Sequence, residues 1–220
     1  MTEQLDRRAD TTRLQILRAA SRQFARKSYS LVSLDDILAD AEVTKGAMYF
    51  HFRSKYALAL AIIEYRAAVA RASVDQLLAQ KLSGLETMID ISYLLAVEDI
   101  GDETARAGLN LLESIGRTDG LQATVLAPWV TAFAAIAGKA VKDGDIISDR
   151  DPEGIARLLV SMYLGLRQTS NLAEPERFLR DLEDMWALML SGFVKPDRID
   201  YLNQFIKRRT AVALKKATPL

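Results

Sequence analysis

Residues 33–55 read SLDDILADAEVTKGAMYFHFRSK, and this stretch decides the fold of the N-terminal part of the chain. Ser33 followed by Asp36 has the spacing of a capping box, in which hydroxyl and carboxylate each satisfy a backbone N–H at a helix start. After a break at residues 41–43, Thr44 is a second N-cap and Ser54 is a third. Two short helices joined by a tight turn, followed by a third helix, predict a helix-turn-helix.

The second short helix is expected to have one buried and one open face. Met48 and Phe52 lie four residues apart and should anchor the helix to the core. Small residues at positions 46 and 47 allow its first turn to approach another surface closely. Lys45 and Tyr49 suit base edges and phosphates, and recognition helices present such N-terminal residues to the major groove. The pattern therefore predicts a DNA-reading helix.

The run VTKGAMYFHFRSK at residues 43–55 resembles the DNA-binding end of the TetR family of transcriptional repressors. That family has the pattern V-[ST]-x-[GPA]-x-[LMI]-Y-x-[HY]-F-x-[SN]-K, and the preceding SLDDILADA also fits it. The resemblance implies that Lys45 reads bases and that Lys55 holds a phosphate. The full set of DNA-contacting positions that it implies is Ser33, Thr44, Lys45, Gly46, Ala47, Tyr49, His51 and Lys55.

Two residues depart from the family pattern. Glu42 stands where a turn glycine is usual, and it places a negative charge near the expected phosphates. Ser28, after the first helix, also replaces a common glycine. Both departures concern the geometry of turns around the DNA-reading helix.

Composition is that of an ordinary soluble globular protein: 220 residues, half of them apolar, with a formal net charge of zero. Residues 1–55 hold ten basic against seven acidic side chains, a modest excess of the sign that DNA binding requires. The absence of cysteine excludes disulfides and thiolate chemistry. The charged N-terminus does not resemble a secretory signal, and the apolar run at 125–138 is interrupted by Pro128 and short for a bilayer. We therefore expect a cytoplasmic protein that does not associate with membranes.

Helical periodicity continues to the end of the chain, and no segment alternates like a strand, so the predicted class is all-α. A first helix is expected from Thr11 or Thr12 to about residue 27. A long helix from residue 55 to about 80 carries an apolar series at positions 58, 62, 65 and 69, and Pro128 is expected to kink or break a later helix. The predicted domains are a three-helix DNA-binding domain at 1–55 and a larger helical ligand-binding and dimerisation domain at 56–220.

Two C-terminal helices, near 152–169 and 175–194, carry wide apolar stripes. Such a stripe indicates burial on more than one side, either in the monomer's own core or against a second subunit. The resemblance to the TetR family favours the second alternative, because these proteins dimerise through two C-terminal helices packed as a four-helix bundle. The basic run at 207–209 is interpreted as a solvated tail.

Further resemblance, to the γ-butyrolactone receptor-like branch of the family, rests on ARAGLNLL at 105–112, on Trp129, and on DMWALMLSGFV at 184–194. In those receptors the tryptophan that matches Trp129 lines the pocket for the signal molecule. A plain core aromatic is the alternative role for this residue. Helix facing adds further candidate effector contacts, and the candidate set is Trp129, Phe133, Met162, Tyr163 and Gln168.

The predicted function is a homodimeric, ligand-responsive transcriptional repressor. It would bind a near-palindromic double-stranded DNA operator and be released by a small, mostly apolar effector, butyrolactone-like or otherwise lipophilic. A TetR-like activator or a ligand-independent DNA binder is the nearest alternative, and a helical enzyme with a vestigial DNA-binding domain is a more distant one. With one histidine, no cysteine and no glycine-rich phosphate loop, the sequence offers no catalytic, metal or cofactor site.

Overall fold

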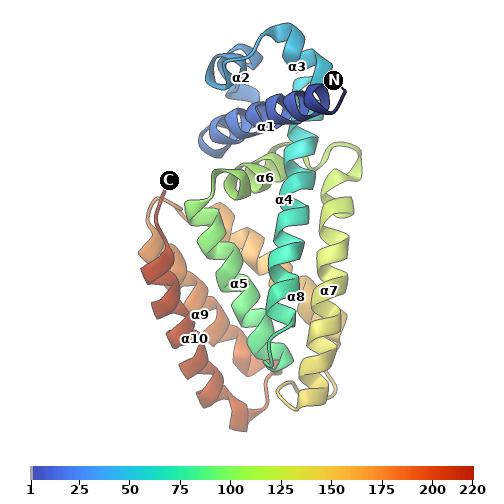
Figure 1. Ribbon diagram of the computed structural model, residues 1–220. Helices are drawn as coiled ribbons and strands as arrows, with labels where there is room; N and C mark the ends of the chain where they lie inside the picture. Colours follow the sequence, from blue (N-terminus) through green and yellow to red (C-terminus); the bar gives the residue numbers. More distant parts are fainter. Residues whose placement is uncertain (1) are drawn as a thin grey trace. The chain divides into compact units, whose positions relative to one another are not determined.

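A computed structural model describes residues 2–220, with side chains from residue 10 onward. The chain is all-α, as predicted, and residues 2–220 contain no strand. Its helices, of which Figure 1 labels α1 to α10, are α1 (Thr2–Arg26), η1 (Tyr29–Leu31), α2 (Leu34–Ala41), α3 (Lys45–His51), α4 (Lys55–Leu78), α5 (Gly84–Gly101), α6 (Glu103–Ile115), η2 (Thr118–Gly120), α7 (Leu121–Asp143), α8 (Pro152–Thr169), α9 (Pro175–Phe193) and α10 (Pro196–Lys216).

The helices form two compact units. Unit 1 comprises Met1–Ala70 and Asp102–Ala123, and unit 2 comprises Arg71–Gly101 and Thr124–Leu220. Unit 1 therefore includes α6, which lies far from the helix-turn-helix in sequence. The predicted domain boundary at residue 55 falls inside unit 1, so the compact units do not coincide with the two predicted functional domains. That functional division remains a prediction.

Helix starts follow the predicted caps. Ser33 and Asp36 form a complete capping box at α2, and the Thr44 hydroxyl accepts the Ala47 N–H at 3.2 Å at the start of α3. The Ser54 hydroxyl does the same for α4. Further along the chain, Ser83 caps α5, and Asp151 caps α8 ahead of a proline at its first turn. Short polar side chains thus fix where these helices begin.

The expected start of the first helix and the expected shortness of the apolar run at 125–138 were wrong, and α7 has no break at Pro128. Helix α1 begins at Thr2, well before Thr11. Helix α7 continues through Pro128, which is exposed, so the chain does not break there. The apolar run at 125–138 belongs to a longer helical stretch, Thr118–Asp143, that has the length and composition to cross a membrane, a test that core helices of soluble proteins also pass.

The buried face of α4 also differs from the predicted series. Leu58 and Ile62 are buried as expected, but Tyr65 is 48% exposed and Val69 is 39% exposed. The buried series continues instead through Arg66 and Ala70, which keeps a spacing of four residues. An arginine at a core position is possible because its aliphatic stem packs while its charged end reaches a partner.

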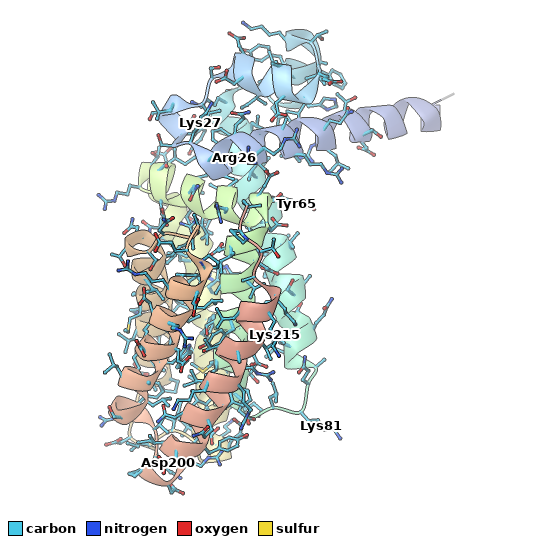
Figure 2. The ribbon with its side chains drawn as sticks, turned by 90° about the vertical axis from the view of Figure 1, so that its left-hand side faces the viewer. Arg26, Lys27, Tyr65, Lys81, Asp200 and Lys215 are labelled. Carbon is cyan, nitrogen blue, oxygen red and sulfur yellow. The ribbon has the colours of Figure 1, made fainter. Side chains whose placement is uncertain are left out.

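Within unit 1, α6 packs along α1 (Figure 1). The amide nitrogen of Asn110 donates to the backbone carbonyls of Phe24 and Ala25, at 2.9 and 3.3 Å, and so caps the last turn of α1. Arg26, labelled at the end of α1 in Figure 2, pairs with Glu103 at 3.2 Å. These contacts join α6 to the C-terminal end of α1.

The approach of α6 to α4 depends on a glycine. A Cβ atom added at Gly108 would lie 2.8 Å from Cβ of Arg66 and 2.9 Å from its Cγ. Those atoms belong to the inflexible base of the side chain, so they could not move away without moving α4. Gly108 therefore sets the closeness of α6 and α4 within unit 1.

A bidentate ion pair joins α1 to α2. The Arg22 guanidinium donates to the Asp40 carboxylate, with Nη2 to Oδ1 at 2.8 Å and Nε to Oδ2 at 3.1 Å. Hydrogen bonding from Arg22 lowers the pKa of Asp40 from its ordinary value of 3.8. The pair holds α2 in place beside the recognition helix.

In unit 2, α5 is the central helix, and most of its residues are buried. Its polar side chains bond to several neighbouring helices. Ser92 accepts the Trp186 indole N–H of α9 at 2.8 Å, and Tyr93 shares a hydrogen bond with Thr210 of α10 at 2.7 Å. Burial raises the pKa of the Tyr93 hydroxyl above its ordinary range, so that group stays neutral. These bonds fix the rotation of α5 in the core of unit 2.

Replacing Gly108 by alanine should destabilise the protein by about 1–3 kcal/mol, because the new methyl group would clash with the base of the Arg66 side chain. The measurement is urea unfolding followed by circular dichroism. Gly138→Ala in α7 is the matched control, since a Cβ there meets nothing within 4 Å. Equal stability of the two variants would contradict the close approach.

Removing the Asp40 carboxylate should change how the free energy of unfolding depends on pH in the acidic range. Because the folded-state pKa of Asp40 is lowered, its contribution is present above 3.8 and is lost as pH falls through the folded value. The difference in unfolding free energy between wild type and Asp40→Asn should therefore shrink as pH falls from 7 towards 3. A difference that stays constant over this range would show that the ion pair does not stabilise the fold.

Candidate nucleic-acid interface

The recognition helix α3 is anchored as the sequence predicted. Met48 is fully buried and Phe52 is 4% exposed, so both belong to the core of unit 1. The guanidinium of Arg13 lies over the Phe52 ring, 5.2 Å from its centroid, and covers that anchor from α1. Arg13 is thus positioned by a protein contact, a role that the sequence did not indicate.

The open face of α3 carries most of the predicted DNA contacts. Lys45 and Gly46 are exposed, Ala47 and His51 are half-buried, and Tyr49 is 43% exposed. Thr44 and Ser33 are exposed at the two helix starts, where their hydroxyls already accept a backbone N–H. The structure therefore leaves the predicted α3 residues wholly or partly accessible around the side of the helix that the anchors do not occupy.

Phe50 was missed by the sequence reasoning. It is 79% exposed on α3, and its ring lies edge-on to the His51 imidazole with the centroids 5.0 Å apart. A phenylalanine between two predicted contact positions could have been noticed, because the anchors at 48 and 52 leave position 50 on the opposite side of the helix. Apolar side chains on such a face can contact thymine methyl groups.

Glu42 shows why the family pattern has a glycine at this place. It ends α2 with φ 54° and ψ 38°, in the left-handed region. Its N–H donates to Ala39 and the N–H of Val43 donates to Leu38, which is the bonding of a Schellman turn. The turn therefore forms with glutamate, at some conformational cost. Ser28 has φ −62°, so no glycine is required there.

Lys55 lies at the first turn of α4 with its ammonium over the ring of Tyr29, 4.3 Å from the centroid. Partial burial lowers the pKa of this lysine, because desolvation disfavours the charged form. Among the side chains that the structure describes, no carboxylate is ion-paired with Lys55. Its N–H donors therefore remain available to an anion.

The candidate effector residues in unit 2 do not all lie in the interior. Phe133 and Tyr163 are buried, and Trp129 and Met162 are half-buried against the hydrophobic core. Gln168 is exposed, near the end of α8. The buried polar side chain on this part of α8 is Arg167, one residue earlier. The prediction therefore placed the interior polar position one residue too late.

Arg167 and Asp99 form a buried polar group that the sequence did not reveal. Asp99 is fully buried; it accepts the Tyr163 hydroxyl at 2.7 Å and lies 3.4 Å from Nε of Arg167. These residues come from α5 and α8. The only sequence signal was the spacing of four between Tyr163 and Arg167, which continues the buried positions at 155 and 159. Tyr163 can therefore offer a ligand its ring, since its hydroxyl is engaged.

Comparison with known proteins identifies the family. The sequence model described as "Bacterial regulatory proteins, tetR family" matches residues 16–62. The one described as "Tetracyclin repressor-like, C-terminal domain" matches residues 82–195, more than half of the chain. The chain belongs to the TetR family. Proteins of this family are transcriptional regulators, so the helix-turn-helix is a DNA-binding element and the enzyme alternative is set aside.

Two known proteins are similar to this chain over about two thirds of their own length. The A-factor receptor protein of Streptomyces griseus is 28% identical over 199 residues, which cover 89% of this chain and 68% of that protein. The transcriptional regulator AcuR of Cereibacter sphaeroides is 31% identical over 149 residues, 64% of this chain and 68% of that protein.

Solved structures agree with this assignment. A γ-butyrolactone receptor described as ArpA-like has a TM-score of 0.80 and 30% identity, covering 93% of this chain and 99% of that one. CprB from Streptomyces coelicolor, solved with its biological operator sequence, has a TM-score of 0.77 and 28% identity, covering 94% and 99%. The resemblance to the γ-butyrolactone receptor branch that the sequence indicated is confirmed.

Replacing Glu42 by glycine should separate backbone strain from charge. We expect Glu42→Gly to stabilise the protein by about 0.5–1 kcal/mol, because glycine adopts the left-handed conformation without steric cost but loses more entropy on folding. Glu42→Gln, the control, keeps the strain and removes the charge. Urea unfolding of both variants tests this, and equal stability of the two would contradict the strain.

Proposed function

We propose that this TetR-family regulator is a homodimeric repressor that holds α3 of each subunit in a major groove of a near-palindromic operator. The open face of α3 carries this proposal. Lys45 would read bases, while Tyr49, Lys55 and Thr44 would hold phosphates and set the register. The two reading helices of a dimer would lie about 34–36 Å apart, one turn of DNA.

Support for a dimer comes from two exposed leucines. The predicted apolar stripe of α9 packs entirely within the core of unit 2, since its members at 178–193 are buried. Leu188 on α9 is nevertheless 79% exposed, and Leu158 on α8 is 46% exposed. Both helices belong to the region that the family resemblance assigns to the subunit interface. We propose that these two leucines lie within it.

Release by an effector is proposed on the likeness to proteins named as A-factor and γ-butyrolactone receptors. The effector would be small and mostly apolar, and would contact Trp129, Phe133, Met162 and the ring of Tyr163. Helix α4 runs from unit 1 into unit 2 and would change the spacing of the two reading helices when the effector binds. A coupling of about 1–3 kcal/mol is typical of such control. The protein would act in the cytoplasm.

Two lysine variants test the assignment of DNA contacts, on duplexes retained from a randomised pool. Lys45→Ala should cost about 1–3 kcal/mol on the best site and relax its choice of base. Lys55→Ala should weaken all sequences alike and lower the slope of log affinity against log salt by about one. Fluorescence anisotropy at several salt concentrations measures both. If Lys55→Ala changed sequence preference instead, the assignment of roles would be wrong.

Leu188→Glu should convert the protein to monomers and abolish operator binding, because it places a charge in the proposed interface. Sedimentation velocity and anisotropy measure the two effects. Val212→Glu on α10, where the native residue is 42% exposed, is the matched control and should remain dimeric. A dimer that survives Leu188→Glu would place the interface elsewhere.

Effector binding has a built-in fluorescence reporter, since the chain holds two tryptophans and Trp186 is buried with its N–H bonded to Ser92. An alkyl-substituted γ-butyrolactone should change the emission of the wild type but not of Trp129→Phe, and should release the operator from the wild type. If no lipophilic compound in a screen released the protein from its operator, the ligand-independent alternative would be favoured.

A further inference from the structure

We propose that Tyr29 is a positioning residue for the phosphate contact of Lys55. The inference rests on the proposed function, in which Lys55 meets the operator backbone, and it assigns a role to a residue outside the recognition helix. Tyr29 belongs to η1, the short turn between α1 and α2, which the family pattern does not connect with DNA binding.

The Tyr29 ring orders the Lys55 ammonium before DNA binds. A lysine ammonium sits at the end of a flexible four-carbon stem, so fixing it on a phosphate costs rotamer freedom. In this structure the ammonium already lies 4.3 Å from the centroid of the Tyr29 ring, within the range of a cation–π contact. Part of the ordering cost is therefore met before DNA arrives.

The contact with the ring leaves the hydrogen-bond donors of the Lys55 ammonium open. Lys55 is half-buried, its pKa is lowered by desolvation, and among the described side chains no carboxylate is ion-paired with it. The ring face supplies a weak attraction to the cation but accepts none of its conventional hydrogen bonds. The ammonium is thus held in place while its donors stay open to a phosphate oxygen.

The Tyr29 ring is itself held in place by the core of unit 1. Tyr29 stacks on Phe24, with centroids 5.9 Å apart and planes 16° apart, and Phe24 is fully buried. The carbonyl of Phe24 accepts the side-chain N–H of Asn110 from α6 at 2.9 Å. The Tyr29 ring therefore packs on the core of unit 1. Its position depends on the packing of α6 against α1, through the Asn110–Phe24 hydrogen bond.

A double-mutant cycle tests the inference on an operator duplex selected from a randomised pool. Tyr29→Leu keeps an apolar side chain against Phe24 but removes the aromatic face, and should weaken binding about two- to fivefold on all sequences alike. Tyr29→Phe keeps the face and should bind like the wild type. In the Lys55→Ala background, Tyr29→Leu should have no further effect.

Two outcomes would overturn the positioning role while leaving the proposed function intact. One is an equal loss from Tyr29→Leu with and without Lys55. The other is a loss from Tyr29→Phe as large as that from Tyr29→Leu, since a hydroxyl contact would then be responsible. If Lys55→Ala changed neither affinity nor salt slope, the phosphate contact itself would be wrong, and the positioning role would fail with it.

A measurement without DNA checks the geometry independently. The ε-methylene protons of Lys55 should show an upfield ring-current shift in the NMR spectrum of the free protein. The shift should persist in Tyr29→Phe and vanish in Tyr29→Leu, while circular dichroism reports that each variant is folded. Absence of the shift in the wild type would overturn the inference whatever the DNA results.

Discussion

The structure depends on the packing of α6 against α1 and α4. Gly108 allows α6 to approach the base of the Arg66 side chain, and Asn110 caps the carbonyls that end α1. The unit that contains the DNA-reading helix is therefore completed by residues 102–123, from the middle of the chain. Contacts of α6 with α1 and α4 therefore join the DNA-binding part of the chain to a segment whose two ends continue into the other unit.

This arrangement would give the proposed effector control a direct covalent route. The chain passes between the units at 70–71, 101–102 and 123–124, so α6 is connected at both ends to helices of unit 2. Asp99, whose carboxylate is bonded to Tyr163 of α8, lies three residues before the N-cap of α6. A ligand that shifted α8 or the end of α5 would act on the same segment that supports α1. In this account α4 and α6 act together, rather than α4 alone.

The sequence predicted what local chemistry determines. The caps at Ser33, Thr44 and Ser54 and the anchors Met48 and Phe52 depend on short-range spacing, and the helix-turn-helix followed from them. Tertiary packing decided the rest. Arg66 occupies a core position only because Gly108 covers its stem, and Asp99 is buried because two residues of α8 reach it. Periodicity could not locate either. It could have separated Arg167 from Gln168, because Arg167 continues the buried series at 155, 159 and 163 and one residue on a helix is a rotation of about 100°.

The central claim is that two copies of this chain read a two-fold symmetric DNA site through α3. The most direct test mixes the purified protein with randomised duplex DNA at about 150 mM salt, where a basic surface alone retains little, and sequences what is captured. The account predicts enrichment of a near-palindrome whose half-sites lie about one helical turn apart, or a whole number of turns. Capture of a single half-site, or no enrichment over bulk duplex, would contradict it.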